Sequence, residues 1–244
     1  MSEITNGNRG RLGVLAFGDS ITNGGGELQW GVALQSWALW VARGLGLPFT
    51  NYAVDGARAA DVLESQIPAF EACTAHPEGR YELGCLYIGV NDVRAPEWEP
   101  AAFERSFRAG LQLLRERCAV VLTATAPSDL GLPPAGAKVQ ELNAVVERVA
   151  GELEVRVIDL RGFRARNLVM ADRVHPTALG QVAIAERALA VLEAAGLRTR
   201  VHPSSLVSFE TSARGRLHAD ATYVLRSARN RLRARLIRRA AGRG

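Results

Sequence analysis

Five short apolar runs alternate with segments of helical periodicity along the chain, and this alternation limits the folds open to it. Within the segments between the runs, apolar residues recur every three or four positions, as at Phe103, Phe107, Leu111 and Leu114. Strands that alternate with helices are joined by right-handed crossovers into a mostly parallel sheet with helices on both faces. We therefore expect an α/β fold, a three-layer α/β/α sandwich around a five-stranded sheet. The five runs are residues 12–17, 49–54, 83–88, 119–125 and 155–160.

The length and composition fit one main domain. The chain has 244 residues, of which 48% are hydrophobic, enough to bury a core of ordinary size. Its three cysteines are widely spaced and form no C-x-x-C pair, which argues against a disulfide framework or a zinc knuckle. Residues 1–11 contain no apolar signal-peptide core, and no apolar stretch is long enough to span a membrane. We expect a cytoplasmic protein.

The C-terminal segment differs in charge from the rest of the chain. Residues 201–244 hold ten of the 30 basic residues and two of the 25 acidic ones, so residues 1–200 carry 20 basic and 23 acidic residues. We therefore place the main domain at residues 1–200 and a basic C-terminal extension at residues 201–244.

Leucines at near-helical spacing predict a helix in this extension. They are Leu225, Leu232 and Leu236. We expect this narrow apolar stripe to pack on the main domain, with the arginines in solvent. The alternative is that the basic helix contacts an anionic surface, such as a membrane, or a protein partner. Nucleic acid is not expected as a partner, because aromatic residues that stack on bases are nearly absent beyond Tyr223.

Polar residues follow several of the expected strands. Ser20 comes after the first run, where the loops of a parallel sheet bind ligands, although an ordinary helix cap is the alternative. Asp172 precedes His175 by three positions and can fold back onto the Nδ1–H of the imidazole, which leaves Nε2 free to take a proton. Asn91 can donate to a developing oxyanion, and the N–H of Gly56 can approach a ligand closely. Both of these residue types also form ordinary turns.

The order of these residues resembles that of the GDSL-type serine hydrolases, also called SGNH hydrolases. Gly-Asp-Ser occurs at 18–20, a glycine at 56, Gly-x-Asn-Asp at 89–92 and Asp-x-x-His at 172–175. The resemblance covers roughly residues 12–195. It implies a flavodoxin-like sheet with the strand order 2-1-3-4-5, which agrees with the alternation of strands and helices.

The resemblance also implies a role for each matched residue. Ser20 is expected as the nucleophile, His175 as general base and then acid, and Asp172 as the carboxylate that orients the imidazole. The backbone N–H groups of Ser20 and Gly56 and the side chain of Asn91 are expected to form the oxyanion hole. The activity implied is hydrolysis of carboxylic esters, with lipid, acyl and acetyl-sugar esters all open.

The same blocks contain further carboxylates. We expect Asp19 and Asp92 to shape their loops by hydrogen bonding, and Asp159 is an alternative carboxylate for the histidine.

The motifs of several other chemistries are absent from the sequence. The chain lacks G-x-S-x-G, and the glycines at 24–26 have neither a Walker lysine nor a G-x-G-x-x-G spacing. Its four histidines show no H-x-x-x-H spacing. We expect no metal, no organic cofactor and a small-molecule ester as partner. The rival hypotheses are an acyltransferase that uses the same acyl-enzyme and a binding module without catalysis.

Overall fold

A computed structural model describes residues 11–73, 79–208 and 212–241. Five strands form one sheet in the order β2-β1-β3-β4-β5, and every neighbouring pair is parallel. The predicted fold class is confirmed, as is the strand order that the resemblance implied, and the strand ends differ from the apolar runs by up to three residues. The strands are β1 (Val14–Gly18), β2 (Phe49–Asn51), β3 (Tyr81–Tyr87), β4 (Cys118–Ala124) and β5 (Arg156–Ile158).

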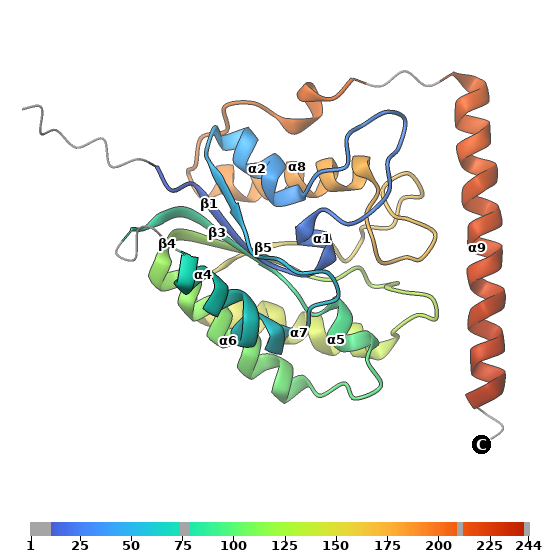
Figure 1. The fold of residues 1–244 in the computed structure, drawn as a ribbon, viewed down its shortest axis with the longest axis horizontal. Coiled ribbons are helices and arrows are strands. Elements are labelled where there is room, and N and C mark those ends of the chain that lie inside the picture. The colour runs from blue at the N-terminus through green and yellow to red at the C-terminus, as the bar shows by residue number, and fades with distance from the viewer. Residues whose placement is uncertain (1–10, 74–78, 209–211, 242–244) are drawn as a thin grey trace, which may run out of the picture.

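Helices cover both faces of the sheet (Figure 1). On one face lie α2 (Trp37–Leu45) and α8 (Ala178–Ala194), and on the other lie α4 (Ile67–Cys73), α6 (Pro100–Arg117) and α7 (Ala137–Glu152). Because helices cover both faces, β1 is buried along its whole length. The remaining elements are α1 (Ser20–Asn23), α3 (Ala59–Asp61), the π-helical turn η1 (Val62–Gln66), α5 (Val90–Arg94), the 3₁₀ turn η2 (Pro203–Leu206) and α9 (Ala213–Ala241).

The carboxyl ends of the five strands meet at one side of the sheet, which we call the carboxyl edge. The short helices α1 and α5 begin there, and in Figure 1 this edge faces the long helix α9. Ligands of open parallel sheets bind at this edge, so it is the place to look for a functional site.

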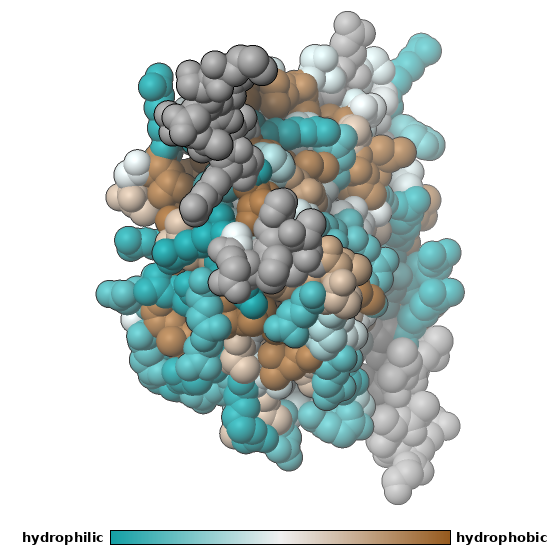
Figure 2. Space-filling view, turned by 60° about the vertical axis from the view of Figure 1, so that its left-hand side comes forward, coloured by the Kyte–Doolittle hydropathy of each residue, from teal (hydrophilic) through white to brown (hydrophobic). Residues whose placement is uncertain are grey.

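The face of the molecule shown in Figure 2 is mixed in character. Hydrophilic side chains are spread over it, and the apolar residues between them form separate patches. In the described ranges, no helix is both long enough and apolar enough to cross a membrane. The cytoplasmic location stays a prediction.

The segment that leads to α9 is attached to the main domain. Glu186 of α8 accepts the backbone N–H of Ser204 at 2.7 Å, and its other carboxylate oxygen lies 2.9 Å from Nδ1 of His202. The division of the chain at residue 200 stays a prediction.

The predicted packing of α9 is wrong. Leu225 and Leu232 are 71% and 58% exposed, so the leucine stripe does not pack on the main domain. The side chain of Leu236 lies outside the described part. The side of α9 that contacts the domain is polar: Arg226 pairs with Glu27, and the Nδ2 of Asn230 donates to a main-chain carbonyl at 3.3 Å. At this place the domain presents a carboxylate and a main-chain carbonyl. Polar side chains can form hydrogen bonds with these groups, whereas leucines would bury them without partners.

Candidate active site

Ser20 is the first residue of α1, directly beyond the end of β1. The chain turns at Gly18, where an added Cβ would lie 2.5 Å from the carbonyl oxygen of Tyr87, so only glycine fits. The carboxylate of Asp19 caps α1 by accepting the N–H of Ile21 at 2.9 Å. The alternative that Ser20 is an ordinary helix cap is therefore wrong, and its hydroxyl is left for other contacts.

Asp172 and His175 lie on a tight turn near the end of the long segment that joins β5 to α8. Oδ1 of Asp172 accepts the backbone N–H groups of Val174 and His175 at 2.9 and 3.1 Å. Between them, Arg173 adopts a left-handed φ of +58°. Thr177 ends the loop as the N-cap of α8, where its Oγ1 accepts an N–H of the first turn at 3.1 Å. The loop therefore fixes the carboxylate and the imidazole relative to each other and to α8.

Ser20, His175 and Asp172 lie in one hydrogen-bonded row. Oγ of Ser20 lies 2.9 Å from Nε2 of His175, and Nδ1 of His175 lies 2.7 Å from Oδ2 of Asp172. An ionised carboxylate only accepts hydrogen bonds, so Nδ1 carries the proton that is donated to Asp172. Nε2 is then left to accept the proton of the serine hydroxyl. All three residues are half-buried, so a ligand can reach the row.

The electrostatics of the row favour a charged pair. The hydrogen bond with Asp172 raises the pKa of His175 above its ordinary value, against burial, which lowers it. Burial acts to raise the pKa of Asp172, but the hydrogen bonds from His175 and from the N–H of Val174 outweigh it, so the pKa is lowered. The carboxylate is therefore ionised, and its negative charge lies where it would stabilise a positive charge on the imidazole ring.

Gly56 and Asn91 lie at the same edge. Nδ2 of Asn91, which is in α5 just beyond β3, donates to the carbonyl of Ala57 at 3.0 Å. Before Gly56 in the chain, the N–H of Val54 donates to the carbonyl of Gly18 at 3.1 Å. These two hydrogen bonds place Gly56 between the turn at the end of β1 and Asn91. An added Cβ at Gly56 would meet no atom within 4 Å, so this residue borders open space.

Two buried glutamines support the site, and the sequence reasoning missed both. Nε2 of Gln181 donates to the carbonyls of Ile21 and Gly25, each at 3.0 Å, and so ties the α1 turn to α8. Gln66 exchanges two hydrogen bonds with the backbone of Gly18, at 2.9 and 2.8 Å. A glutamine among the apolar residues of a helix stripe is the signal that could have pointed to Gln181, because a buried amide needs partners.

Asp19 directly precedes Ser20 in the sequence, and Asp92 directly follows Asn91. Asp19 is 1% exposed, and within the described ranges its Oδ2 has no hydrogen-bond partner. Burial raises the pKa of Asp19 to about 7. Both oxygens of Asp92 lie 3.2 Å from the N–H of Ala59, and burial raises the pKa of Asp92 above its usual range. In the described part of the chain, no group of three or more His, Cys, Asp or Glu residues is arranged to hold a metal ion.

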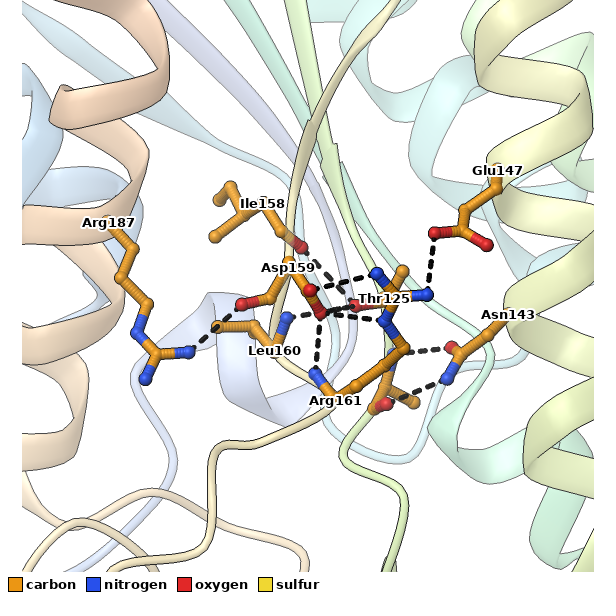
Figure 3. Close-up of polar contacts among 9 residues, drawn as sticks. Thr125, Asn143, Glu147, Ile158, Asp159, Leu160, Arg161 and Arg187 are labelled. Atoms are coloured by element: carbon orange, nitrogen blue, oxygen red, sulfur yellow. Dashed lines mark hydrogen bonds and ion pairs between the residues drawn. The ribbon is translucent and has the colours of Figure 1, made fainter.

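Asp159, the alternative carboxylate, belongs to a different network at the end of β5 (Figure 3). Its two oxygens accept hydrogen bonds from Nε and Nη2 of Arg161 at 2.9 and 2.8 Å, which hold the pKa of Asp159 far below its usual range. Thr125 donates to the same carboxylate at 3.3 Å, and Arg187 of α8 donates to the Asp159 carbonyl at 2.9 Å. The carboxylate that contacts His175 is Asp172, not Asp159.

Solved structures with the same fold are similar to the chain at low sequence identity. A lipolytic protein of the G-D-S-L family from Veillonella parvula is 24% identical, with a TM-score of 0.60 over 74% of this chain and 97% of its own. An acetylxylan esterase from Geobacillus stearothermophilus is 19% identical, with a TM-score of 0.56 over 75% and 95% of the two chains. An alpha/beta hydrolase from the metagenome of Lake Arreo, Spain, is 18% identical, with a TM-score of 0.57 over 74% and 94%.

The sequence itself matches one family model. No curated protein matches the chain. The model of the GDSL-like lipase/acylhydrolase family matches residues 16–183, more than half of the chain and the part that contains Ser20, Gly56, Asn91, Asp172 and His175. The chain therefore belongs to the GDSL-like lipase/acylhydrolase family and is a carboxylic ester hydrolase.

Proposed function

We propose that the chain cleaves esters through an acyl-enzyme on Ser20, with His175 as general base and acid and Asp172 as its orienting carboxylate. The single observation that carries this proposal is the hydrogen-bonded row, with 2.9 Å between Ser20 Oγ and His175 Nε2 and 2.7 Å between His175 Nδ1 and Asp172. A nucleophile next to a base that a third group orients is the arrangement used in covalent acyl transfer.

The first half of the reaction acylates the serine. Oγ of Ser20 bonds to the ester carbonyl carbon while its proton passes to Nε2 of His175, and the carbonyl π electrons move onto the oxygen. Asp172 stabilises the imidazolium that results. When the oxyanion collapses, the bond between the carbonyl carbon and the alcohol oxygen breaks, and His175 gives its proton to the leaving oxygen.

The second half releases the acid. A water molecule attacks the acyl carbon as His175 takes one of its protons, and a second oxyanion forms. Its collapse breaks the bond to Oγ of Ser20, which takes the proton back from Nε2. The products are the alcohol and the carboxylic acid, and water is the only co-reactant.

Three donors around Gly56 support an oxyanion hole. Within the described ranges, the backbone N–H groups of Ser20 and Gly56 donate to no protein acceptor. The amide of Asn91 uses one N–H for Ala57, which leaves the second for a ligand. We assign these three N–H groups to the developing oxyanion, where preorganised donors stabilise the transition state.

The substrate we propose is a small-molecule ester. Likeness to an acetylxylan esterase supports an acetylated sugar as one candidate. Family membership supports lipid and other acyl esters as well. Ser20 is only half-buried, which is compatible with approach by a substrate of either class.

A fluorophosphonate probe tests the proposal directly. We expect it to label wild-type protein at Ser20 and to leave Ser20→Ala unlabelled. p-Nitrophenyl esters of graded chain length, run beside acetylated xylooligosaccharides, then identify the acyl group, and product analysis with added alcohols detects acyl transfer. Turnover by a folded Ser20→Ala variant at the wild-type rate would overturn the proposal, and so would the absence of label on wild-type protein.

A further inference from the structure

One face of α9 carries apolar side chains that the main domain leaves uncovered. We name Leu217, Val224, Leu225 and Leu232 the outer stripe; these side chains are 71%, 54%, 71% and 58% exposed. Their positions follow one another at i, i+7, i+8 and i+15, which places them on one side of a helix. Burying such leucines stabilises a protein, so a run of them in water indicates a surface that meets something else.

The opposite side of α9 is held against the main domain by polar contacts. Arg226 pairs with Glu27, Asp220 pairs with Arg166, and the guanidinium of Arg166 lies 5.6 Å from the centre of the Tyr223 ring. These contacts fix which side of the helix faces the domain. The outer stripe therefore points away from it.

Arginines border the outer stripe. Arg229 follows Leu225 by four positions, and Arg231 follows Val224 by seven, so each lies beside the stripe on the helix surface. Both are exposed, as is Arg233, and within the described ranges none of the three forms an ion pair with an acidic residue. An occupant of this face must therefore supply both an apolar layer and negative charge.

We propose that α9 docks in the plane of an anionic lipid bilayer, with the outer stripe at the acyl boundary and the arginines among the lipid headgroups. A helix with an apolar stripe and a basic border binds such a surface through burial and electrostatic attraction together. A second copy of α9 would supply the apolar layer but would bring its own arginines against these, so charge complementarity favours the lipid.

Docking would bring the carboxyl edge close to the bilayer. Glu27, which pairs with Arg226, accepts through its carbonyl the N–H of Ala178 at the start of α8, and Asn230 contacts Ala171, next to Asp172. This consequence rests on the proposed function, since it places the hydrolytic row near ester groups at a lipid surface. The docking itself does not depend on hydrolysis.

Vesicle sedimentation of the full chain tests the docking. We expect the protein to bind vesicles of equal phosphatidylcholine and phosphatidylglycerol and to stay in solution with phosphatidylcholine alone. The double variant L225Q/L232Q is expected to lower the affinity by about tenfold or more. The triple variant R229Q/R231Q/R233Q is expected to lower it by about a hundredfold, because each arginine near an anionic surface contributes.

Matched controls separate the docking face from general effects. Leu206→Gln changes a leucine of similar exposure in η2, and R105Q/R156Q/R198Q removes three exposed arginines of the main domain. Both are expected to bind as the wild type does, and Ser20→Ala should also bind unchanged, which separates docking from catalysis. Circular dichroism checks that the variants keep their helix content.

Three results would overturn the proposal. One is wild-type protein that remains in solution with the anionic vesicles. Another is binding by L225Q/L232Q and by R229Q/R231Q/R233Q that is as strong as that of the wild type. The third is a wild-type dimer in sedimentation velocity that L225Q/L232Q turns into a monomer, since the stripe would then be covered by a second copy.

Discussion

Oγ of Ser20 lies 2.9 Å from Nε2 of His175, although 155 positions separate the two residues in the chain. If this contact moves the proton of the nucleophile, each partner is needed for turnover. We expect Ser20→Ala and His175→Ala to lower kcat by about 10⁴–10⁶ while the fold remains intact. Steady-state hydrolysis of a p-nitrophenyl ester measures the loss. His202→Ala is the matched control, because His202 also pairs with a carboxylate at 2.9 Å, that of Glu186 in the middle of α8. Equal losses in both histidine variants would contradict the assignment.

Asp172 is expected to set the pH at which His175 becomes available as a base. Its hydrogen bond raises the pKa of His175, so the wild-type activity is expected to fall with acid at a pH above the ordinary histidine value of 6.5. Asp172→Asn removes this contribution, so the acid limb of kcat/KM should move to lower pH while kcat falls by about 10⁴. A pH profile of both proteins measures the shift. The control is Glu186→Gln, which changes the carboxylate beside His202. An unmoved acid limb would show that Asp172 does not set the pKa of the base.

Asn91 is expected to act on the transition state more than on substrate binding. Asn91→Ala removes one of three N–H donors, so kcat should fall by about 10²–10³ with KM little changed. Since Asn91 also donates to Ala57 at 3.0 Å, its loss can loosen the Gly56 loop. Thermal unfolding of the variant checks this, and a rise in KM with kcat preserved would mean that Asn91 binds substrate rather than the oxyanion.

Much of this site was predictable because its signals are local. The run before Ser20 is short and apolar throughout, and Asp172 and His175 are three positions apart, so short windows of sequence contain the pattern. The support by Gln181 is not local, since the Ile21 carbonyl that it binds is 160 positions away. The side of α9 that faces the domain could not be predicted either, because it also depends on a residue far away in the sequence. Its leucine spacing is identical whichever side faces the domain, and the side is fixed by Glu27, 199 positions from Arg226.

Gln181 is expected to stabilise the nucleophile turn. Gln181→Leu would leave the carbonyls of Ile21 and Gly25 and the N–H of Trp37 without their partner, at 3.0, 3.0 and 2.8 Å in the structure. The Ile21 carbonyl keeps a hydrogen bond from the N–H of Gly24 at 3.4 Å, so two groups are left unpaired. Unpaired buried groups cost about 1–3 kcal/mol each, so we expect the free energy of unfolding to fall by about 2 kcal/mol or more. Urea denaturation measures the change. Gln140→Leu, on the exposed side of α7, is the control, and a similar effect in both variants would contradict the role of Gln181.

Asp19 is expected to make stability depend on pH. Its pKa is about 7 in the folded chain against 3.8 as the ordinary value, so the folded state holds its proton more tightly than the unfolded state. The stabilisation is therefore complete below pH 3.8 and is lost as the pH rises to about 7. Across that window the loss amounts to at most roughly 4 kcal/mol.

Asp19→Asn removes this titration, since its amide oxygen can still accept the N–H of Ile21. Relative to the wild type, the variant should therefore gain stability between about pH 4 and about pH 8. Urea unfolding at both pH values measures the gain, and Glu116→Gln, at an exposed position of α6, should show none. If the free energies of the wild type and Asp19→Asn instead changed in parallel with pH, the Asp19 carboxyl would have to be ionised at no cost in its buried place, and burial would not be what governs it.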